Sequence, residues 1–392
     1  MIKKITNSIR KIENCIYVAV LRLFVRNTKS HFTIQSPILI ISDTTRTGGT
    51  YTFLSNLVDN FEHYPYSLAV YPINKLSAAP IDFLQNNKVQ FYRNKAKTKL
   101  GFFLDIAGIV NHSRPGLVII SSGALDHVLP VLSLNVPTLF FLHTLPHKPL
   151  PKYLEFMLRT HLTEQKRLVG VSEASQKAIH SYIPGLPTDR VTFLYNYVRN
   201  KPSPVPKTLQ HPITILTIGH LLSYKNPFLW IDVATKLLTQ HPHIPLQFLW
   251  LGEGELFEEC KHRSAALSPA IQFLGFCSDV HPYLEKATFY FQPSSTESFG
   301  LSVAEAMMHG VPTVVSNAGA LPELVEHNVS GLVFDLDNPE AASQALEHCI
   351  TMDPTEYRNL SLQARQRYEQ MFTQDRWMQS FKNLTKEIGV NI

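Results

Sequence analysis

The 392-residue chain is predicted to be an α/β protein with two Rossmann-like, doubly wound domains behind a basic N-terminal helix. Three observations predict this architecture. Short apolar runs alternate with helical segments in two successive sets. A proline-rich segment separates the two sets. The chain is also longer than one hydrophobic core usually serves, so two domains are expected.

Residues 1–34 are expected to form a basic amphipathic arm. Seven lysines or arginines and one glutamate give residues 1–30 a net charge of +6, whereas the whole chain carries +5. On a helical wheel one face is apolar: Ile2, Ile5, Ile9, Ile12, Ile16, Val20 and Leu23. Such a helix is suited to lie on an anionic membrane. Arg22 interrupts its apolar run, which is too short to span a bilayer. Packing of the helix on its own domain stays open as the alternative.

Residues 35–199 are expected to form the first Rossmann-like domain. Its seven apolar runs show little polar alternation, as is typical of buried parallel strands. These runs are PILIISD, YSLAVYPI, VQFYRN, GLVIISSG, PTLFFLHT, RLVGVSE and VTFLYNYV. Residues 200–212 then carry four prolines in thirteen positions and are expected to be a linker.

Residues 213–370 are expected to form the second Rossmann-like domain, and residues 371–392 a C-terminal helix. The apolar runs of this domain are ITILTIG, LQFLWLGEG, IQFLG, TFYFQPS, PTVVSN and GLVF. Ligands of doubly wound sheets bind at the carboxyl ends of the strands. The residues that follow each run are therefore the candidate site residues.

Composition excludes some function classes. The four cysteines show no C-x2-C spacing, which argues against structural zinc and fits a reducing, cytosolic compartment. The seventeen histidines form no H-E-x-x-H motif. Because the positive charge is confined to the arm, nucleic-acid binding is not expected.

The most informative segment follows the run TFYFQPS, where a glycine turn opens a helix between two carboxylates, Glu297 and Glu305. Backbone N–H groups at this helix start are expected to lack intrahelical partners and to favour a bound phosphate. They belong to Ser298, Phe299, Gly300 and Leu301. A carboxylate beside a sugar accepts hydrogen bonds from its hydroxyls and favours positive charge in an oxocarbenium-like transition state.

This segment, SSTESFGLSVAEAMMHGVPTVVSNAG, resembles the E-x7-E motif of the retaining GT-B glycosyltransferases of glycosyltransferase family 4, also called glycosyl transferases group 1. The resemblance implies a GT-B architecture of two Rossmann-like domains that face a cleft. It also implies that Glu297 faces the donor sugar and the reacting centre as a catalytic residue, and that Glu305 binds the ribose of the nucleotide. The C-terminal helix resembles the one that, in this family, crosses back to the N-terminal domain.

The segment after ITILTIG resembles the family's G-R-L-x3-K element, in which arginine and lysine hold the donor diphosphate. Gly219 and Lys225 match this element, but His220 stands where the family has arginine. The resemblance implies that Lys225 neutralises the leaving diphosphate without a metal. A neutral histidine does not supply the bidentate hydrogen bonds of arginine. It therefore stays open whether the protein has full activity and whether it uses the family's usual nucleotide sugar.

Three residues of the first domain also match family positions. Gly48 and Gly49 follow PILIISDTTRT and resemble the glycine pair that meets the donor phosphates. His143 closes the run PTLFFLH and corresponds to a histidine that many members place near the donor sugar, as a catalytic residue. A histidine that merely ends a strand is an equal alternative.

No metal or cofactor is expected. Asp335-Leu336-Asp337 has the D-x-D pattern that binds a metal in the other large glycosyltransferase fold. Here the pattern precedes a helical segment, so Asp337 or Asn338 is expected to cap a helix instead.

The sequence therefore predicts an enzyme that moves a sugar from a nucleotide sugar to an acceptor hydroxyl with retention of configuration. The basic arm favours a saccharide or lipid-linked acceptor in surface glycan or glycolipid synthesis, and a cytoplasmic protein peripheral to the inner face of the membrane. Two alternatives remain open. One is a GT-B sugar-nucleotide epimerase or hydrolase, and the other is a nucleotide-sugar binding protein that has lost catalysis.

Overall fold

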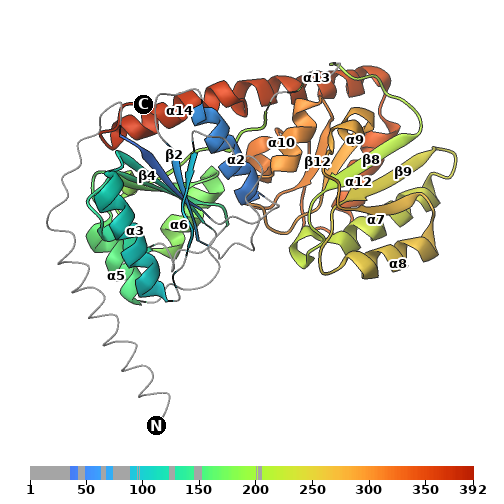
Figure 1. Cartoon of the computed structure of the whole chain (residues 1–392). Coiled ribbons are helices and arrows are strands. Elements are labelled where there is room, and N and C mark those ends of the chain that lie inside the picture. Colours follow the sequence, from blue (N-terminus) through green and yellow to red (C-terminus); the bar gives the residue numbers. More distant parts are fainter. Residues whose placement is uncertain are drawn as a thin grey trace, which may run out of the picture. The chain divides into compact units, whose positions relative to one another are not determined.

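The computed structural model describes residues 36–42, 49–62, 68–73, 89–94, 96, 98–122, 129–144, 152–199, 201 and 205–392. The arm of residues 1–34 and Gly48 lie outside the described residues. The chain divides into two compact units, one of Met1–Leu194 with Met378–Ile392 and one of Tyr195–Trp377 (Figure 1).

The first unit contains a parallel sheet of seven strands in the order β3-β2-β1-β4-β5-β6-β7. The strands are β1 (Ile38–Ser42), β2 (Leu68–Pro72), β3 (Val89–Phe91), β4 (Leu117–Ser122), β5 (Thr138–Leu142), β6 (Lys166–Gly170) and β7 (Val191–Phe193). The helices are α2 (Gly49–Glu62), α3 (Lys99–Ser113), η2 (Leu129–Ser133), α5 (Lys152–His161), α6 (Glu173–Tyr182) and η3 (Thr188–Arg190). Each of the seven predicted apolar runs overlaps one of these strands, and six of them contain the whole strand; β6 begins one residue before its run.

Helices cover both faces of this sheet. Residues of α3, α5 and α6 share one apolar core with the strands. On the other face, Phe53 of α2 packs on Phe141 of β5 with ring centroids 4.7 Å apart. The five residues of β1 are all buried, which is why its sequence is apolar without alternation.

The second unit contains a parallel sheet of six strands in the order β10-β9-β8-β11-β12-β13. The strands are β8 (Ile213–Ile218), β9 (Leu246–Leu251), β10 (Ile271–Gly275), β11 (Phe289–Gln292), β12 (Thr313–Ser316) and β13 (Gly331–Phe334). The helices are η4 (Ser223–Lys225), α7 (Pro227–Gln240), α8 (Phe257–Leu267), α9 (His281–Lys286), α10 (Leu301–Met308), α11 (Leu321–Leu324), α12 (Ala341–Thr351), α13 (Pro354–Met371) and α14 (Gln374–Glu387).

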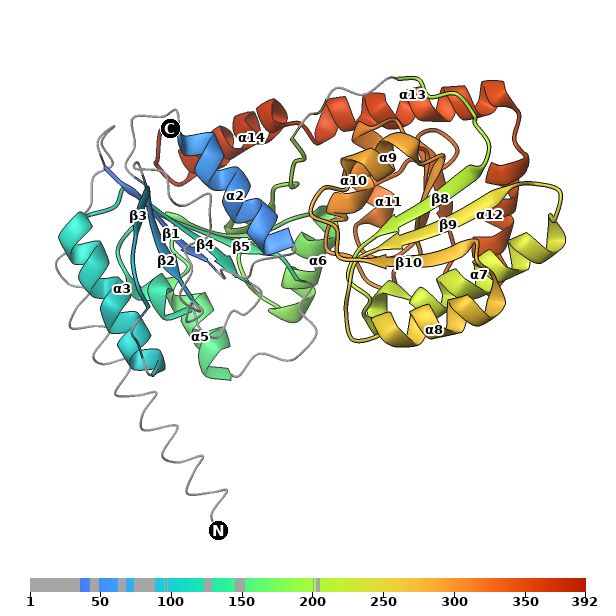
Figure 2. The ribbon, with the colours of Figure 1, turned by 45° about the vertical axis from the view of Figure 1, so that its right-hand side comes forward.

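In this unit α7 and α8 lie on one face of the sheet, and α9, α10 and α11 on the other (Figure 2). Trp230 of α7 contacts Phe248 and Trp250 of β9 edge to face, with ring centroids 5.8 and 5.4 Å away. All three side chains are buried. The aromatic rings fix how α7 lies on the strands, and so fix the loop that leads from β8 into α7.

The unit boundary lies earlier than the sequence-based boundaries of residues 199 and 213. The backbone before the proline-rich segment packs on α13 and its end: Val198 N–H donates to Phe372 O at 3.1 Å, and Tyr368 OH donates to Val198 O at 2.8 Å. The proline-rich segment is also tied to this unit, because Lys207 N–H donates to Ser361 Oγ at 2.8 Å. Residues 195–212 therefore belong to the second unit.

Helix α14 begins in the second unit, and its residues from Met378 onward belong to the first. There Phe381 packs edge to face on Phe61 of α2, with ring centroids 5.7 Å apart. Within the described residues, no helix is long and apolar enough to cross a bilayer.

Candidate functional site

The candidate site lies where the strand order of the second sheet reverses. Strand β8 pairs with β9 on one side and with β11 on the other, so the chain leaves β8 and β11 toward opposite faces. Side chains that follow these two strands meet in the crevice at their carboxyl ends. Lys225 ends η4 after β8, and Glu297 follows β11.

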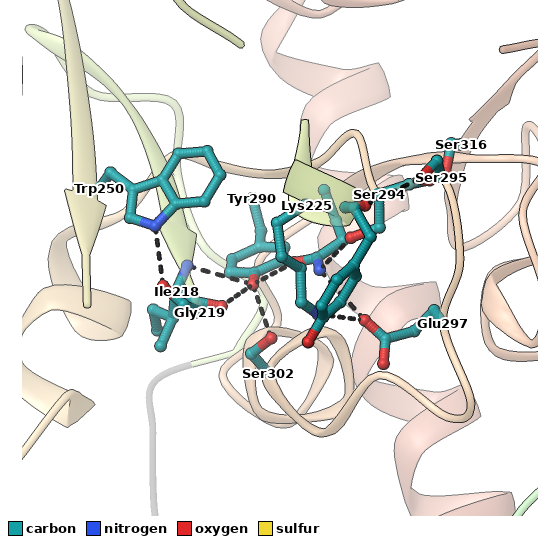
Figure 3. Close-up of polar contacts among 12 residues, drawn as sticks. Ile218, Gly219, Lys225, Trp250, Tyr290, Ser294, Ser295, Glu297, Ser302 and Ser316 are labelled. Atoms are coloured by element: carbon teal, nitrogen blue, oxygen red, sulfur yellow. Dashed lines mark hydrogen bonds and ion pairs between the residues drawn. The ribbon is translucent and has the colours of Figure 1, made fainter. Parts of the chain in front are cut away.

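Lys225 and Glu297 form an ion pair across this crevice, although they are 72 positions apart in the sequence (Figure 3). Lys225 Nζ lies 2.5 Å from Glu297 Oε2, and the two side chains are 12% and 15% exposed. Gln292 Nε2 donates to the same oxygen at 3.3 Å. No hydrogen bond from a described residue reaches Glu297 Oε1. One carboxylate oxygen is therefore held by the protein and the other is open to a ligand.

The turn between Glu297 and α10 depends on Gly300, whose φ of 105° and ψ of 57° lie in the left-handed region. Among the described residues, no acceptor pairs with the backbone N–H groups of Phe299, Gly300 or Leu301. These groups point out of a helix start, where the helix dipole also favours an anion. They match three of the four N–H groups predicted from the sequence.

The side chain of Phe299 has a structural role. It is 3% exposed and packs against Tyr195 and Phe372, with ring centroids 6.0 and 5.6 Å away. Only its backbone is placed to bind a ligand. Ser298, the fourth predicted N–H donor, already has an interaction partner of its own.

Gly319, which the sequence reasoning missed, holds the backbone of Glu297. Ala320 N–H donates to Glu297 O at 3.0 Å. A Cβ added at Gly319 would lie 2.1 Å from that oxygen, and the φ of this residue is +56°. A glycine is therefore required where the chain after β12 crosses Glu297. The available sequence signal was a glycine two residues after the predicted strand PTVVSN.

Glu305 lies on α10 and is half-buried. Burial raises the pKa of its carboxyl group to about 7, and the nearby charge of Lys201 partly opposes this rise. No hydrogen bond from a described residue reaches the carboxylate. A half-buried carboxylate to which no described residue donates a hydrogen bond can bind ligand hydroxyls.

The residues directly after β8 are close to Lys225 in the chain but do not join the ion pair. His220 is exposed. Gly219 O accepts a hydrogen bond from Trp250 Nε1 at 2.9 Å. The backbone is packed tightly here, since a Cβ at Gly252 would lie 2.1 Å from that same oxygen.

His143 and Gly49 belong to the first unit. His143 follows β5, and its Nε2 lies 2.9 Å from Ser121 Oγ at the end of β4. Its ring packs on Phe53, with ring centroids 4.7 Å apart. Burial lowers the pKa of His143 to about 4, so its ring is neutral near pH 7. Gly49 is the first residue of α2.

The D-x-D segment forms a hydrogen-bonded loop. Asp335 Oδ1 accepts from Asn317 Nδ2 at 2.8 Å and from Asp337 N at 3.1 Å. The predicted cap at Asp337 or Asn338 is wrong, because α12 begins at Ala341 with Glu340 as its N-cap residue. Asn338 Oδ1 instead accepts from Glu340 N at 3.1 Å, which forms a turn before the helix. Across the described part of the chain, no cluster of three histidine, cysteine or acidic residues is arranged to hold a metal.

The second unit carries most of the similarity to known sequences. Residues 201–367 match the family model of glycosyl transferases group 1. An uncharacterised glycosyltransferase of Haemophilus influenzae is 34% identical over 155 residues, which are 39% of this chain and 43% of that protein. The UDP-Gal:alpha-D-GlcNAc-diphosphoundecaprenol alpha-1,3-galactosyltransferase of Escherichia coli is 29% identical over 133 residues, which are 33% of this chain and 34% of that protein. The matches thus span less than half of each relative's length.

Solved structures match nearly the whole chain. A glycosyltransferase from Rickettsia africae has a TM-score of 0.76 at 16% identity, over 91% of this chain and 100% of that one. Anabaena HepE in complex with UDP and glucose has a TM-score of 0.70 at 17% identity, over 90% of this chain and 100% of that one. At these identities the likeness shows the fold alone. It confirms the predicted GT-B architecture.

Proposed function

We propose that this protein transfers a sugar from a nucleotide-sugar donor to an acceptor hydroxyl with retention of configuration. Residues 201–367 match the family model of glycosyl transferases group 1, and the fold is GT-B. One observation carries the proposal. The Lys225–Glu297 pair lies beside the N–H groups that open α10 and that no described residue accepts from, so a cation, a carboxylate and an anion-binding helix start share one crevice.

Each group has a role in this proposal. Lys225 and the N–H groups of α10 bind the donor diphosphate and neutralise the charge that grows on it as the glycosidic bond breaks. The open Oε1 of Glu297 accepts hydrogen bonds from the donor sugar and favours positive charge at the anomeric carbon. Glu305 accepts hydrogen bonds from the ribose. These protein groups supply the charge, and the proposal includes no metal or cofactor.

We propose front-face attack for the chemical step. The acceptor oxygen forms a bond to the anomeric carbon while the bond from that carbon to the diphosphate oxygen breaks. The departing phosphate oxygen takes the acceptor proton, so no protein nucleophile is needed. Gly48 and Gly49 are proposed to bind donor phosphates, the neutral His143 is proposed to act at the donor sugar, and the first unit is proposed to bind the acceptor.

The acceptor is proposed to be a saccharide or a lipid-linked saccharide of a surface glycan or glycolipid. The name of the E. coli relative includes a diphosphoundecaprenol-linked sugar, which supports this class. The basic arm of residues 1–30 supports a cytoplasmic protein held peripherally at the anionic inner face of the membrane. No nucleic-acid partner is proposed.

Thermal stabilisation by nucleotides tests the donor site. The full chain is heated alone and with UDP, GDP, ADP, CMP or their sugars, and Glu305→Ala is tested beside it. We expect one nucleotide family to raise the melting temperature of the parent protein and to raise that of the variant much less. The absence of stabilisation by any nucleotide, or equal stabilisation of the variant, would contradict the donor site.

NMR of the reaction with the identified donor then tests the reaction itself. A product with the donor's anomeric configuration on an added acceptor supports retaining transfer, and an inverted product contradicts retention. Change of the donor sugar without any acceptor identifies an epimerase, and equal release of free sugar with and without acceptor identifies a hydrolase. Tight nucleotide binding without turnover identifies a binding protein.

A further inference from the structure

A buried amide lies directly behind Glu297. Gln292, the last residue of β11, is 1% exposed. Its Nε2 donates to Ser294 Oγ at 2.8 Å and to Glu297 Oε2 at 3.3 Å. Its Oε1 accepts from Tyr290 OH at 2.8 Å. Both amide protons and the amide oxygen therefore have partners, which is the condition for burying this group at low cost.

The groups around this amide fix which way it points. The Tyr290 hydroxyl also lies 2.7 Å from Ser302 Oγ, 3.2 Å from Ile218 N and 3.1 Å from Ile218 O. A hydroxyl has one proton, and Gln292 Oε1 and Ile218 O can only accept, so these two oxygens share the Tyr290 proton while Ser302 and the Ile218 N–H donate to Tyr290. Burial raises the pKa of Tyr290, so the proton stays in place. A flipped amide would place its oxygen against the Glu297 carboxylate.

We propose that Gln292 is a positioning residue that, with Lys225, holds Oε2 of Glu297 and leaves Oε1 as the oxygen presented to the donor sugar. That Oε1 faces a sugar rests on the proposed function. That Gln292 holds the Glu297 carboxylate does not depend on it. The chain of contacts runs from Ser302 on α10 through Tyr290 and Gln292 to Glu297. The start of the helix and the carboxylate are therefore fixed by one network.

Gln292 matters most when a donor is bound. A diphosphate attracts Lys225, which then divides its charge between the phosphate and Glu297. The amide of Gln292 is neutral, and all its hydrogen-bonding protons are used inside the protein, so a phosphate does not compete for it. Gln292 keeps Glu297 in position while Lys225 binds the leaving group.

Structures of variants test the holding role without any knowledge of the donor. We would crystallise the full chain as the parent, as Gln292→Met and as Tyr290→Phe, which removes one hydroxyl and keeps the core volume. In both variants the Glu297 carboxylate is expected to turn away from its parent position. Thr313→Val is the matched control, because it removes a buried hydroxyl without a partner from the neighbouring strand. A parent-like Glu297 in both Gln292→Met and Tyr290→Phe overturns the proposal.

Kinetics with a nucleotide sugar from the thermal panel test the positioning role. Gln292→Met should lower kcat by about tenfold to a hundredfold, the scale of a small misplacement of a catalytic group. The Kd of the nucleoside diphosphate should stay within about twofold, because this binding does not need the open oxygen of Glu297. Thr313→Val should leave kcat at the parent value.

A double-mutant cycle separates positioning from general damage. In a Glu297→Gln background, Gln292→Met should cause no further loss of kcat, because the group that it positions is already gone. Equal losses in both backgrounds overturn the proposal. If no nucleotide sugar is turned over, the proposed function fails, and the crystal structures still decide whether Gln292 holds Glu297.

Discussion

At Glu297 the two oxygens of one carboxylate have different surroundings. Lys225 and Gln292 bind Oε2, and no described residue binds Oε1. A carboxylate has capacity for several hydrogen bonds, so an open oxygen in a crevice lowers the cost of binding a polyhydroxyl ligand. The ion pair also keeps Lys225 in place before a ligand arrives. In a partly buried site the removal of one partner is costly, because it leaves the other charge unpaired.

Glu297→Ala is predicted to leave the fold intact and to lower transfer by at least about a hundredfold to a thousandfold, the usual loss for a group that stabilises transition-state charge. The measurement is kcat with the identified donor, together with circular dichroism and the melting temperature. Glu258→Ala, at an exposed position of α8, is the control. A folded Glu297→Ala protein with parent turnover would refute the assignment of Glu297.

Glu305→Gln is predicted to change how stability depends on pH. The raised pKa, about 7, means that the folded protein binds the Glu305 proton more tightly than the unfolded chain does. This group's contribution to stability is therefore present below the unfolded pKa near 4.5 and is lost as pH rises to about 7. Glutamine does not titrate, so the variant should match the parent at low pH and be more stable above pH 7, by at most about 3 kcal/mol.

Urea unfolding of the parent and of Glu305→Gln at a series of pH values measures this difference. His143 and His309 also titrate with pKa values lowered by burial, but both proteins contain them, so their effect cancels in the comparison. A stability difference that stays constant from pH 4 to 8 would show that Glu305 does not carry the raised pKa.

At the scale of elements, the site depends on how loops cross one another after the strands. The loop after β12 crosses the backbone of Glu297 at Gly319, and the loop after β9 crosses Gly219 at Gly252. Neither crossing leaves space for a side chain. These crossings hold the carboxyl ends of the central strands at fixed positions, which a site with an ion pair of 2.5 Å requires.

Gly319→Ala is predicted to destabilise the second unit by about 1–3 kcal/mol, because its Cβ would clash with Glu297 O and because φ is positive. Stabilisation of the protein by nucleotides should weaken as well, because the backbone movement at Gly319 would displace Glu297. Gly108→Ala is the matched control. Gly108 lies inside α3 with no atom within 4 Å of an added Cβ, so alanine should stabilise there by about 0.5–1 kcal/mol. Equal effects of the two substitutions on the free energy of urea unfolding would contradict the claim that the crossing at Gly319 excludes a side chain.

At the scale of the whole molecule, the strand order reverses in the same way in both sheets, but the two units have different roles in the proposed function. The second unit contains the family match, the ion pair and both glutamates of the motif. The first unit contains His143 and Gly49, and the chain adds the basic arm before it. Donor chemistry is therefore proposed to depend on the second unit, and membrane attachment on residues outside both sheets.

Deletion of residues 1–30 is predicted to release the protein from vesicles that contain anionic phosphatidylglycerol, as measured by co-sedimentation. A full-length variant with Lys3→Gln and Lys4→Gln should bind about 30-fold more weakly, at about 1 kcal/mol for each lysine near the surface. Neutral phosphatidylcholine vesicles are the control for charge. If the shortened chain sediments as the full chain does, the arm packs on its own domain instead.

The sequence by itself determined the elements. Buried parallel strands are apolar without alternation, so all thirteen strands could be recognised as runs, and the glycine turn between Glu297 and Glu305 marked the helix start. The boundary of the second unit differs from the predicted one, because the hydrogen bonds of Val198 and Lys207 with α13 and its end join distant segments of the chain. A local pattern of prolines carries no information about such contacts.

Only the tertiary structure decided which side chains meet. Whether β8 lies beside β11 depends on the order of strands in the sheet, and that order brings Lys225 to Glu297 and leaves His220 exposed. In the sequence Gln292 is one residue of an apolar run. Only the fold shows that its amide lies between Tyr290 and Glu297. The physical reason is the same in each case. Local sequence sets the backbone conformation, whereas a site is formed by hydrogen bonds and charges between residues far apart in the chain.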